Sequence, residues 1–408
     1  MLREEIQLMW KAAAVLLGAA LPLILLGKAV TSVCLISGIL FGLLATKGTS
    51  LRSTVTYLLG SNVFRMLIAV YVAFSFSAAF GIDRAYAMEQ LLQLFGLGLG
   101  GILLYIVIRE MPSRDVQIPL RTLAVATIFV MTLSLVDAFL NDQRLSQALH
   151  GDNWEHRDRL NFMSTSLAVI LPFFWAWLIK KDQEQEVLAH SFALPVAVVS
   201  FWVIFVCGGR AGWISGTVAA LIFLWLAGTR HQFTLHGRHW LLSIFVVAIG
   251  PLLYGLARGM DTLVSRINPA MEKFGPGSGR LDIWEFAMSK IPENPVFGIG
   301  LNSFRKLSFD GVELASTMHP HNFVLQLLLE TGIVGFAAVA AVALYVLYIF
   351  WKYAQGNLYG VAALCSYLAF WVGSLANTSI FHEWWLLFLI VPSLIGMRVG
   401  WSEQTHAR

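Results

Sequence analysis

Apolar segments of about 20 residues recur along the whole chain and alternate with short polar stretches. A segment of about this length crosses the hydrocarbon core of a bilayer as one α-helix. Twelve helices are predicted in this way, at residues 12–27, 29–46, 64–80, 90–108, 119–139, 163–179, 192–207, 212–228, 239–257, 332–351, 359–378 and 384–400. The pattern therefore predicts an all-α, polytopic integral membrane protein with about twelve transmembrane helices.

One long polar segment, residues 258–320, interrupts this pattern and divides the chain. Residues 1–257 carry the first nine predicted helices, and residues 321–408 carry a motif helix and the last three. Within the loop, residues 280–291 form an amphipathic helix candidate. Turns are predicted after it, at Pro292, Pro295, Gly298 and Gly300. The loop is too short for an independent catalytic domain, so we expect it to cover an opening between helices.

Charge and composition refine this picture. The chain is 57% hydrophobic and 13% charged, against about 25% charged in soluble domains. With a cytoplasmic N-terminus, 15 Lys and Arg residues lie inside and six lie in the short outer segments, which fits the positive-inside rule. The long loop then lies outside. The net charge of +4 needs no nucleic-acid partner. Three distant cysteines, Cys34, Cys207 and Cys365, predict neither a disulfide framework nor a zinc site.

A polar cluster, "TMHPHNFVLQLLLETGIVGF" at residues 317–336, precedes the tenth predicted span. Pro320 suits the first turn of a helix, with His319 just before it. A single helix over 321–351 would be about 46 Å long, whereas the hydrocarbon core is about 30 Å thick. The helix therefore either protrudes or breaks near Gly332, and both options place His321 at the mouth of a cavity.

Three further polar residues follow at helical spacing: Asn322, Gln326 and Glu330 share one helix face. Polar groups beside a span are usually functional and have a nearby partner. We expect this face to line the cavity, and the alternative is that it packs against the outer loop.

Arginines on the same predicted side are candidate partners. Arg210 lies in "CGGRAGWISG", a turn of small residues that lets other groups approach closely. Arg280 begins "RLDIW" in the long loop, and "HRDRLNF" supplies Arg157 and Arg159. Guanidinium groups suit bidentate binding of phosphate oxygens, while each arginine could instead be a solvated or salt-bridged loop residue.

Several motifs are missing from the sequence. No acidic D-x-D pair lies on the outer side, and neither a P-loop nor a G-x-G-x-x-G nucleotide motif between a strand and a helix occurs. His319 and His321 alone are a weak metal signal. We therefore expect no metal and no cofactor. The donor should carry its own activated leaving group and arrive from the lipid, as a polyprenyl pyrophosphate does.

The motif residues resemble a known family. His321-Asn322, nine residues, Gly332, two residues and Gly335 fit the H-[NSQ]-x9-G-x-x-[GTY] signature of bacterial O-antigen ligases. The arginines of "GGRAGW" and "GRLDIW" resemble those of the wider superfamily of O-antigen ligases, O-antigen polymerases and related oligosaccharyltransferases. The similarity also covers the architecture of many spans with one large outer loop before the motif.

The resemblance implies a glycosyltransferase of the bacterial inner membrane. Such enzymes move a finished O-antigen chain from undecaprenyl pyrophosphate to a sugar of lipid A-core on the periplasmic face, with inversion and without metal or ATP. His321 corresponds to the proposed base, and Arg210, Arg280 and Arg159 to pyrophosphate-binding arginines. Asn322, Gln326 and Glu330 would support the site. The expected partners are the lipid-linked glycan, the lipid A-core acceptor and membrane lipids, with no nucleic acid.

Rival functions remain open at the sequence level. An O-antigen polymerase would use the same lipid-linked donor. A transporter of lipid-linked sugars would also carry charged groups, but transporters often show inverted repeats, and no matching halves are visible in this sequence. A purely structural scaffold would not need a histidine and several arginines at one opening.

Overall fold

The protein is a helical bundle in the computed structural model, which describes residues 2–46, 48–139, 156–184, 193–207, 209–230, 280–307, 319–376 and 379–406. No strand occurs among these residues, as predicted. The α-helices are α1 (Leu2–Ala19), α2 (Lys28–Ala45), α3 (Gly48–Gly60), α4 (Asn62–Phe80), α5 (Arg84–Glu110), α6 (Gln117–Phe139), α8 (His156–Glu184), α9 (Ala193–Val206), α10 (Arg210–Arg230), α13 (Arg280–Lys290), α14 (Phe323–Gly356), α15 (Leu358–Ser374) and α16 (Glu383–His406). The described residues also form three 3₁₀ turns: η1 (Pro22–Leu26), η4 (Ile291–Glu293) and η5 (Phe304–Lys306).

Seven of the described helices are long and apolar enough to cross a membrane, and α15 is a shorter apolar helix. The chain is therefore a multi-pass membrane protein. The exact number of twelve spans stays a prediction, since the segment expected at 239–257 lies outside the described residues. Helix α3 was not expected, because its sequence mixes Ser, Thr and Arg with apolar residues and contains no continuous apolar run.

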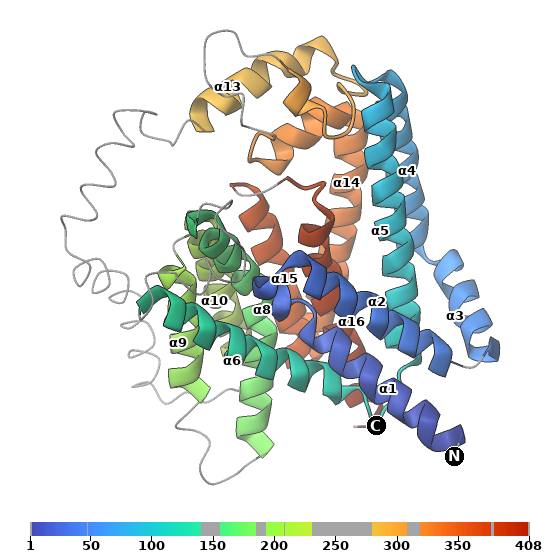
Figure 1. Cartoon of the computed structure of the whole chain (residues 1–408), viewed down its shortest axis with the longest axis vertical. Helices are drawn as coiled ribbons and strands as arrows, with labels where there is room; N and C mark the ends of the chain where they lie inside the picture. Colours follow the sequence, from blue (N-terminus) through green and yellow to red (C-terminus); the bar gives the residue numbers. More distant parts are fainter. Residues whose placement is uncertain are drawn as a thin grey trace.

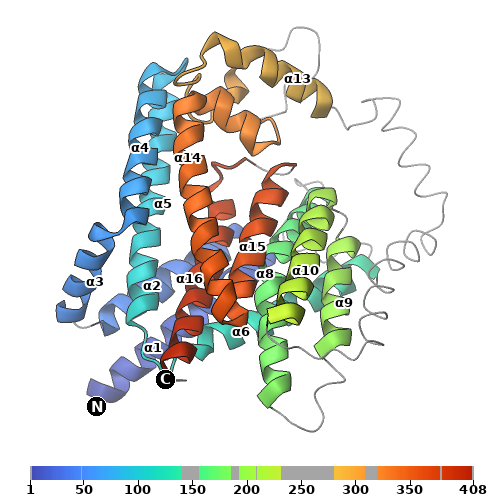
Figure 2. The same ribbon diagram turned by 180° about the vertical axis from the view of Figure 1, so that it is seen from behind.

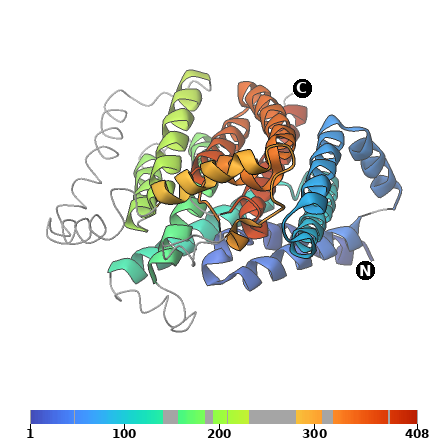
Figure 3. The ribbon, with the colours of Figure 1, turned by 90° about the horizontal axis from the view of Figure 1, so that it is seen from above.

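Helix α15 forms the centre of the bundle and packs against α8, α10, α14 and α16. Nearly all of its side chains are buried. Phe370 of α15 stacks on Trp385 of α16 with ring centres 4.9 Å apart, and the Trp385 indole N–H donates to the Ser374 hydroxyl over 2.8 Å. Figures 1 and 2 show α4, α5 and α14 standing side by side next to this centre, with α13 on top. Seen from above, α13 crosses the middle of the bundle (Figure 3).

Helix α13 confirms the amphipathic helix predicted at 280–291. Ile283 and Ala287 are buried beneath it, whereas Glu285 and Met288 are exposed. The 3₁₀ turn η4, which contains Pro292, ends it as expected. The buried side packs with Ile299, Phe304 and Leu329 in a small separate apolar core, which attaches the helix to the top of α14.

Helix α14 breaks at Gly332, so the second of the two predicted alternatives is correct. Gly332 has φ +63° and ψ −172°, a backbone conformation that glycine adopts without steric penalty. A Cβ atom there would lie 2.3 Å from the carbonyl oxygen of Val296. Any larger residue would therefore push the outer loop away from the break.

The outer loop replaces the helical hydrogen bonds that the break removes. The N–H groups of Ile299 and Gly300 donate to the carbonyls of Leu329 and Glu330, both over 3.0 Å. In the opposite direction, the N–H groups of Ile333 and Val334 donate to the carbonyls of Pro295 and Val296 over 2.9 and 3.3 Å. Buried backbone groups need such partners, and the loop segment and the broken helix therefore form one rigid unit.

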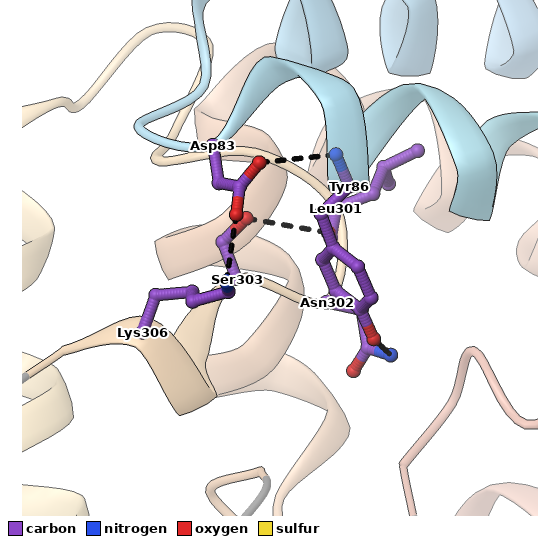
Figure 4. A network of polar contacts seen from close by, with 6 residues as sticks. All are labelled: Asp83, Tyr86, Leu301, Asn302, Ser303 and Lys306. Atoms are coloured by element: carbon purple, nitrogen blue, oxygen red, sulfur yellow. Dashed lines mark hydrogen bonds and ion pairs between the residues drawn. The ribbon is translucent and has the colours of Figure 1, made fainter.

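The same loop is attached to the turn between α4 and α5 (Figure 4). Lys306 pairs with Asp83 over 2.7 Å, and Asp83 also accepts from the N–H of Tyr86 over 3.1 Å. Asn302 donates to the Tyr86 hydroxyl over 3.0 Å. Segments that the charge pattern assigns to one side of the membrane thus meet at one end of the bundle.

Candidate functional site

The turn that carries His321 lies directly before α14. The helix begins at Phe323, and Asn322 is its N-cap: the Asn322 side-chain oxygen accepts from the N–H groups of Val324 and Leu325 over 3.0 and 3.2 Å. The expectation that Pro320 occupies the first helical turn was therefore wrong. Asn322 caps the helix more effectively than a residue without a side-chain acceptor, so the helix starts two residues after His321.

His321 is half-buried and has a left-handed backbone with φ +52°. Residues other than glycine adopt this conformation rarely, and it often marks functional sites. Its N–H donates to Nδ1 of His319 over 3.2 Å, and the two ring centres are 4.2 Å apart. The preceding carbonyl of Pro320 accepts from the indole N–H of Trp284 over 2.9 Å. Helix α13 and His319 therefore hold the turn from two sides.

A third histidine, His382, joins this cluster and was missed at the sequence level. It lies in the turn between α15 and α16, and its ring centre is 5.8 Å from that of His319. Its Nδ1 accepts from the Trp384 indole N–H over 3.1 Å. The available signal was its place between the last two predicted spans, on the same predicted side as His321.

Electrostatic effects connect the histidines with the arginines. Burial, together with the smaller effects of the charges of His321, His382 and Arg280, lowers the pKa of His319 to about 2. Burial and the charge of Arg210 lower the pKa of Arg280, the first residue of α13. The side chains of Arg210, Arg280 and the histidine cluster therefore act on one another across three separate segments.

Arg210 is exposed at the start of α10, in the small-residue turn that the sequence predicted. The Ser164 hydroxyl of α8 donates to the carbonyls of Ile204 and Gly209 over 2.9 and 3.2 Å. A Cβ atom on Gly212 would lie 2.0 Å from that hydroxyl. The glycine thus allows α8 and α10 to approach closely at the end of α10 that carries Arg210.

Arg159 lies near the start of the same helix α8, five residues before Ser164 in the sequence. Its side chain and that of Arg157 lie outside the described residues. The role of Arg159 in binding pyrophosphate stays a prediction.

Gln326 and Glu330 share one helix face, as the spacing predicted, and both are buried. The two carboxyl oxygens of Glu330 accept from the N–H groups of Asn302 and Phe304 over 3.1 and 2.9 Å. Gln326 donates to Glu330 over 3.1 Å and to the Ser379 hydroxyl over 2.7 Å. This face therefore binds the outer loop and the α15–α16 turn, in agreement with the alternative that it packs against the loop.

The ring nitrogens limit what the histidine cluster can bind. Nδ1 of His319 and Nδ1 of His382 each accept a hydrogen bond. In the described part of the chain, no group of three His, Cys, Asp or Glu side chains is arranged to hold a metal ion. The charge of Arg280 instead acts on His319, and that of Arg210 acts on Arg280. An imidazole is able to accept a proton, and a guanidinium group is able to bind an anion.

Residues 195–340 match the family model described as O-Antigen ligase. This segment of the chain is therefore similar to the O-antigen ligase family. Known relatives agree: a "Putative polysaccharide ligase" of Rickettsia bellii is 23% identical over 160 residues, which cover 36% of this chain and 38% of the relative. A protein with the same description in Rickettsia conorii is 27% identical over 116 residues, covering 26% and 28%. An uncharacterized protein of Haemophilus influenzae is 24% identical over 196 residues, covering 44% and 46%. Each alignment thus spans less than half of the relative.

The region shared with the O-antigen ligase family contains Arg210, Arg280 and His321. It also contains the break at Gly332 and the segment 295–304 that stabilises it. Arg159 and His382 lie outside this region. The similarity therefore covers the motif helix and two of the three predicted arginines.

Proposed function

We propose that this protein transfers O-antigen polysaccharide from undecaprenyl pyrophosphate to a sugar of lipid A-core, on the periplasmic face of the bacterial inner membrane. The main support is that the ring of His319, 4.2 Å from the ring of His321, is affected by the charge of Arg280, which is itself affected by the charge of Arg210. The similarity of residues 195–340 to the O-antigen ligase family supports the reaction class. The predicted division into residues 1–257, 258–320 and 321–408 is part of this proposal.

The proposed step needs one base and one anion-binding group. A neutral imidazole of His321 takes the proton of the acceptor hydroxyl, while the hydroxyl oxygen bonds to the anomeric carbon of the donor. The bond between that carbon and the pyrophosphate oxygen breaks, and its electron pair leaves with the pyrophosphate. Attack opposite the leaving group inverts the anomeric centre.

The arginines act on the leaving group. Arg210 and Arg280 stabilise the negative charge that grows on the pyrophosphate, and such electrostatic stabilisation is usually the largest single contribution to catalysis. Arg159 is proposed as a third ligand. The proposed role of Asn322, Gln326 and Glu330 is to support the turn and the loop around this site. No metal or cofactor is included in the proposed step.

The test is transfer by the purified protein from a lipid-linked donor to lipid A-core, followed on a lipopolysaccharide gel. In cells, deletion should leave bare core lipid together with lipid-linked polymer. Core that carries a single repeat would instead indicate an O-antigen polymerase. Uptake into proteoliposomes without a covalent product would indicate a transporter.

A further inference from the structure

His319 lies two residues before the proposed base and has the features of a positioning group. Its side chain is 9% exposed and belongs to no helix. Its Nδ1 accepts the backbone N–H of His321 over 3.2 Å. A ring nitrogen that accepts a hydrogen bond carries no proton, so the proton of a neutral His319 is on Nε2. The low pKa of His319, caused first by burial, agrees with a neutral ring.

The backbone of His321 needs such a partner. Its left-handed conformation, with φ +52°, is unfavourable for a residue with a Cβ atom. The flanking residues are fixed by other contacts: Trp284 binds the carbonyl of Pro320, and Asn322 caps α14. The N–H of His321 points to His319, and this bond ties the strained residue to the buried ring.

A second ring supports His319. The ring of His382 lies edge-on to it, with centres 5.8 Å apart and planes at 74°. The Trp384 indole N–H donates to Nδ1 of His382 over 3.1 Å. The α15–α16 turn therefore packs against His319, and His319 in turn binds the backbone of His321.

We propose that His319 is a positioning residue, whose δ nitrogen holds the backbone of His321 in the conformation that directs the base toward the arginines. The expected effects on kcat rest on the proposed function, whereas the expected effect on the backbone of His321 does not.

Substitutions of His319 can separate the effect of its hydrogen-bond acceptor from the effect of the size of its ring. His319→Asn places its side-chain oxygen at the δ position, three bonds from Cα, where it can accept the N–H of His321. His319→Gln places its amide one bond further out, at the position of Nε2. His319→Ala removes the acceptor altogether. The Asn and Gln variants are matched in polarity, so they form the decisive pair.

We expect His319→Asn to keep kcat within about threefold of the wild type, while His319→Gln and His319→Ala lose about tenfold or more in kcat. Misplacing a reacting group by 1 Å can cost about 100-fold. The KM for the lipid-linked donor should stay unchanged, because the arginines are intact. Equal activity of all three variants, or equal loss in Asn and Gln, would overturn the role of the δ acceptor.

A measurement without turnover separates this inference from the proposed function. Diethylpyrocarbonate modifies accessible imidazoles, and peptide mass spectrometry reports the rate at His321. We expect this rate to change in the Ala and Gln variants and to stay near the wild type in the Asn variant. If that pattern holds while the wild type shows no transfer, the proposed function fails and the positioning role stands. An unchanged rate in all variants contradicts the positioning role.

Discussion

Two polar groups lie within ten residues of each other on either side of the start of α14, and their surroundings differ. Gln326 and Glu330 are buried, and their side chains bind the outer loop and the α15–α16 turn through hydrogen bonds of 2.7–3.1 Å. His321 is half-buried and strained, and its ring lies beside that of His319, on which the charge of Arg280 acts. The first group satisfies its polar atoms internally, which is what a structural network requires. The second group combines a strained backbone with an ionisable ring, and backbone strain is often found at functional sites.

The comparison predicts that substitutions in the two groups impair different properties of the protein. Substitution in the His321 group should reduce transfer by a folded protein. Substitution in the Gln326–Glu330 group should reduce stability and leave the chemistry of the remaining folded protein intact.

His321 should show the largest effect on transfer. General-base catalysis contributes about 100- to 10,000-fold, so we expect His321→Ala to lose activity in that range. His321→Gln should fail similarly, because an amide is polar but cannot take the proton. Donor binding should persist through the arginines, and the melting temperature should change little. Near-normal turnover by a folded His321→Ala protein would make His321 a packing residue.

The arginines should show the next largest effect. A hydrogen bond to a charged group contributes about 1.5–3 kcal/mol, so Arg280→Lys and Arg210→Lys should each weaken donor binding roughly tenfold or more. Lysine keeps the charge but loses the planar fork that binds two phosphate oxygens. The quantities to measure are kcat and the KM for the lipid-linked donor, because the proposed arginines bind the pyrophosphate and also stabilise the charge that grows on it.

Arg305 provides the control for these variants. It is exposed on the same outer loop, and its guanidinium lies 4.2 Å from the centre of the Tyr86 ring. Arg305→Lys should leave the donor KM unchanged. Full activity of Arg210→Ala and Arg280→Ala would remove both residues from the site.

Glu330 should affect stability more than transfer. Glu330→Ala leaves the N–H groups of Asn302 and Phe304 without their carboxyl acceptors, at a cost of about 1–3 kcal/mol for each buried donor. We expect a lower melting temperature in detergent and less protein in the membrane. Glu330→Gln keeps one acceptor oxygen and should lose less.

The two groups are distinguished by measuring kcat on the folded fraction of each variant. A Glu330→Ala protein with the melting temperature of the wild type would show that the network contributes little to stability. A Glu330→Ala protein that is stable but inactive would place Glu330 with His321 instead.

The sequence predicted the helical class, the amphipathic helix at 280–291 and the break at Gly332 as one of two options. It did so because these features depend on local apolar spacing and on glycine. It predicted that Gln326 and Glu330 share a face, but not what they bind. Their partners, at 302–304 and 379–380, are distant in the sequence and become neighbours only when the loop folds over α14.

The arrangement around His321 was harder to predict for the same reason. Charge bias placed Arg210, Arg280 and His321 on one side of the membrane, but it could not show that they interact. His382 was missed because its role depends on the α15–α16 turn reaching His319. The left-handed backbone of His321 has no clear signal in the sequence, since only a few per cent of residues other than glycine adopt it, even though histidine is enriched among them.

Removal of metal should show the smallest effect of all. Three histidines in one cluster resemble a zinc site. Treatment with a chelator tests whether the cluster binds a metal ion or instead consists of the proposed base, His321, and the residues that position it. Zinc needs deprotonated ring nitrogens in tetrahedral geometry, yet Nδ1 of His319 and Nδ1 of His382 already accept hydrogen bonds. We therefore expect EDTA to leave transfer by the purified protein unchanged within error, at saturating donor and without added nucleotide. Loss of product with EDTA, restored by a divalent ion in the wild type but not in His382→Ala, would reassign the cluster as a metal site and remove His321 from the role of base.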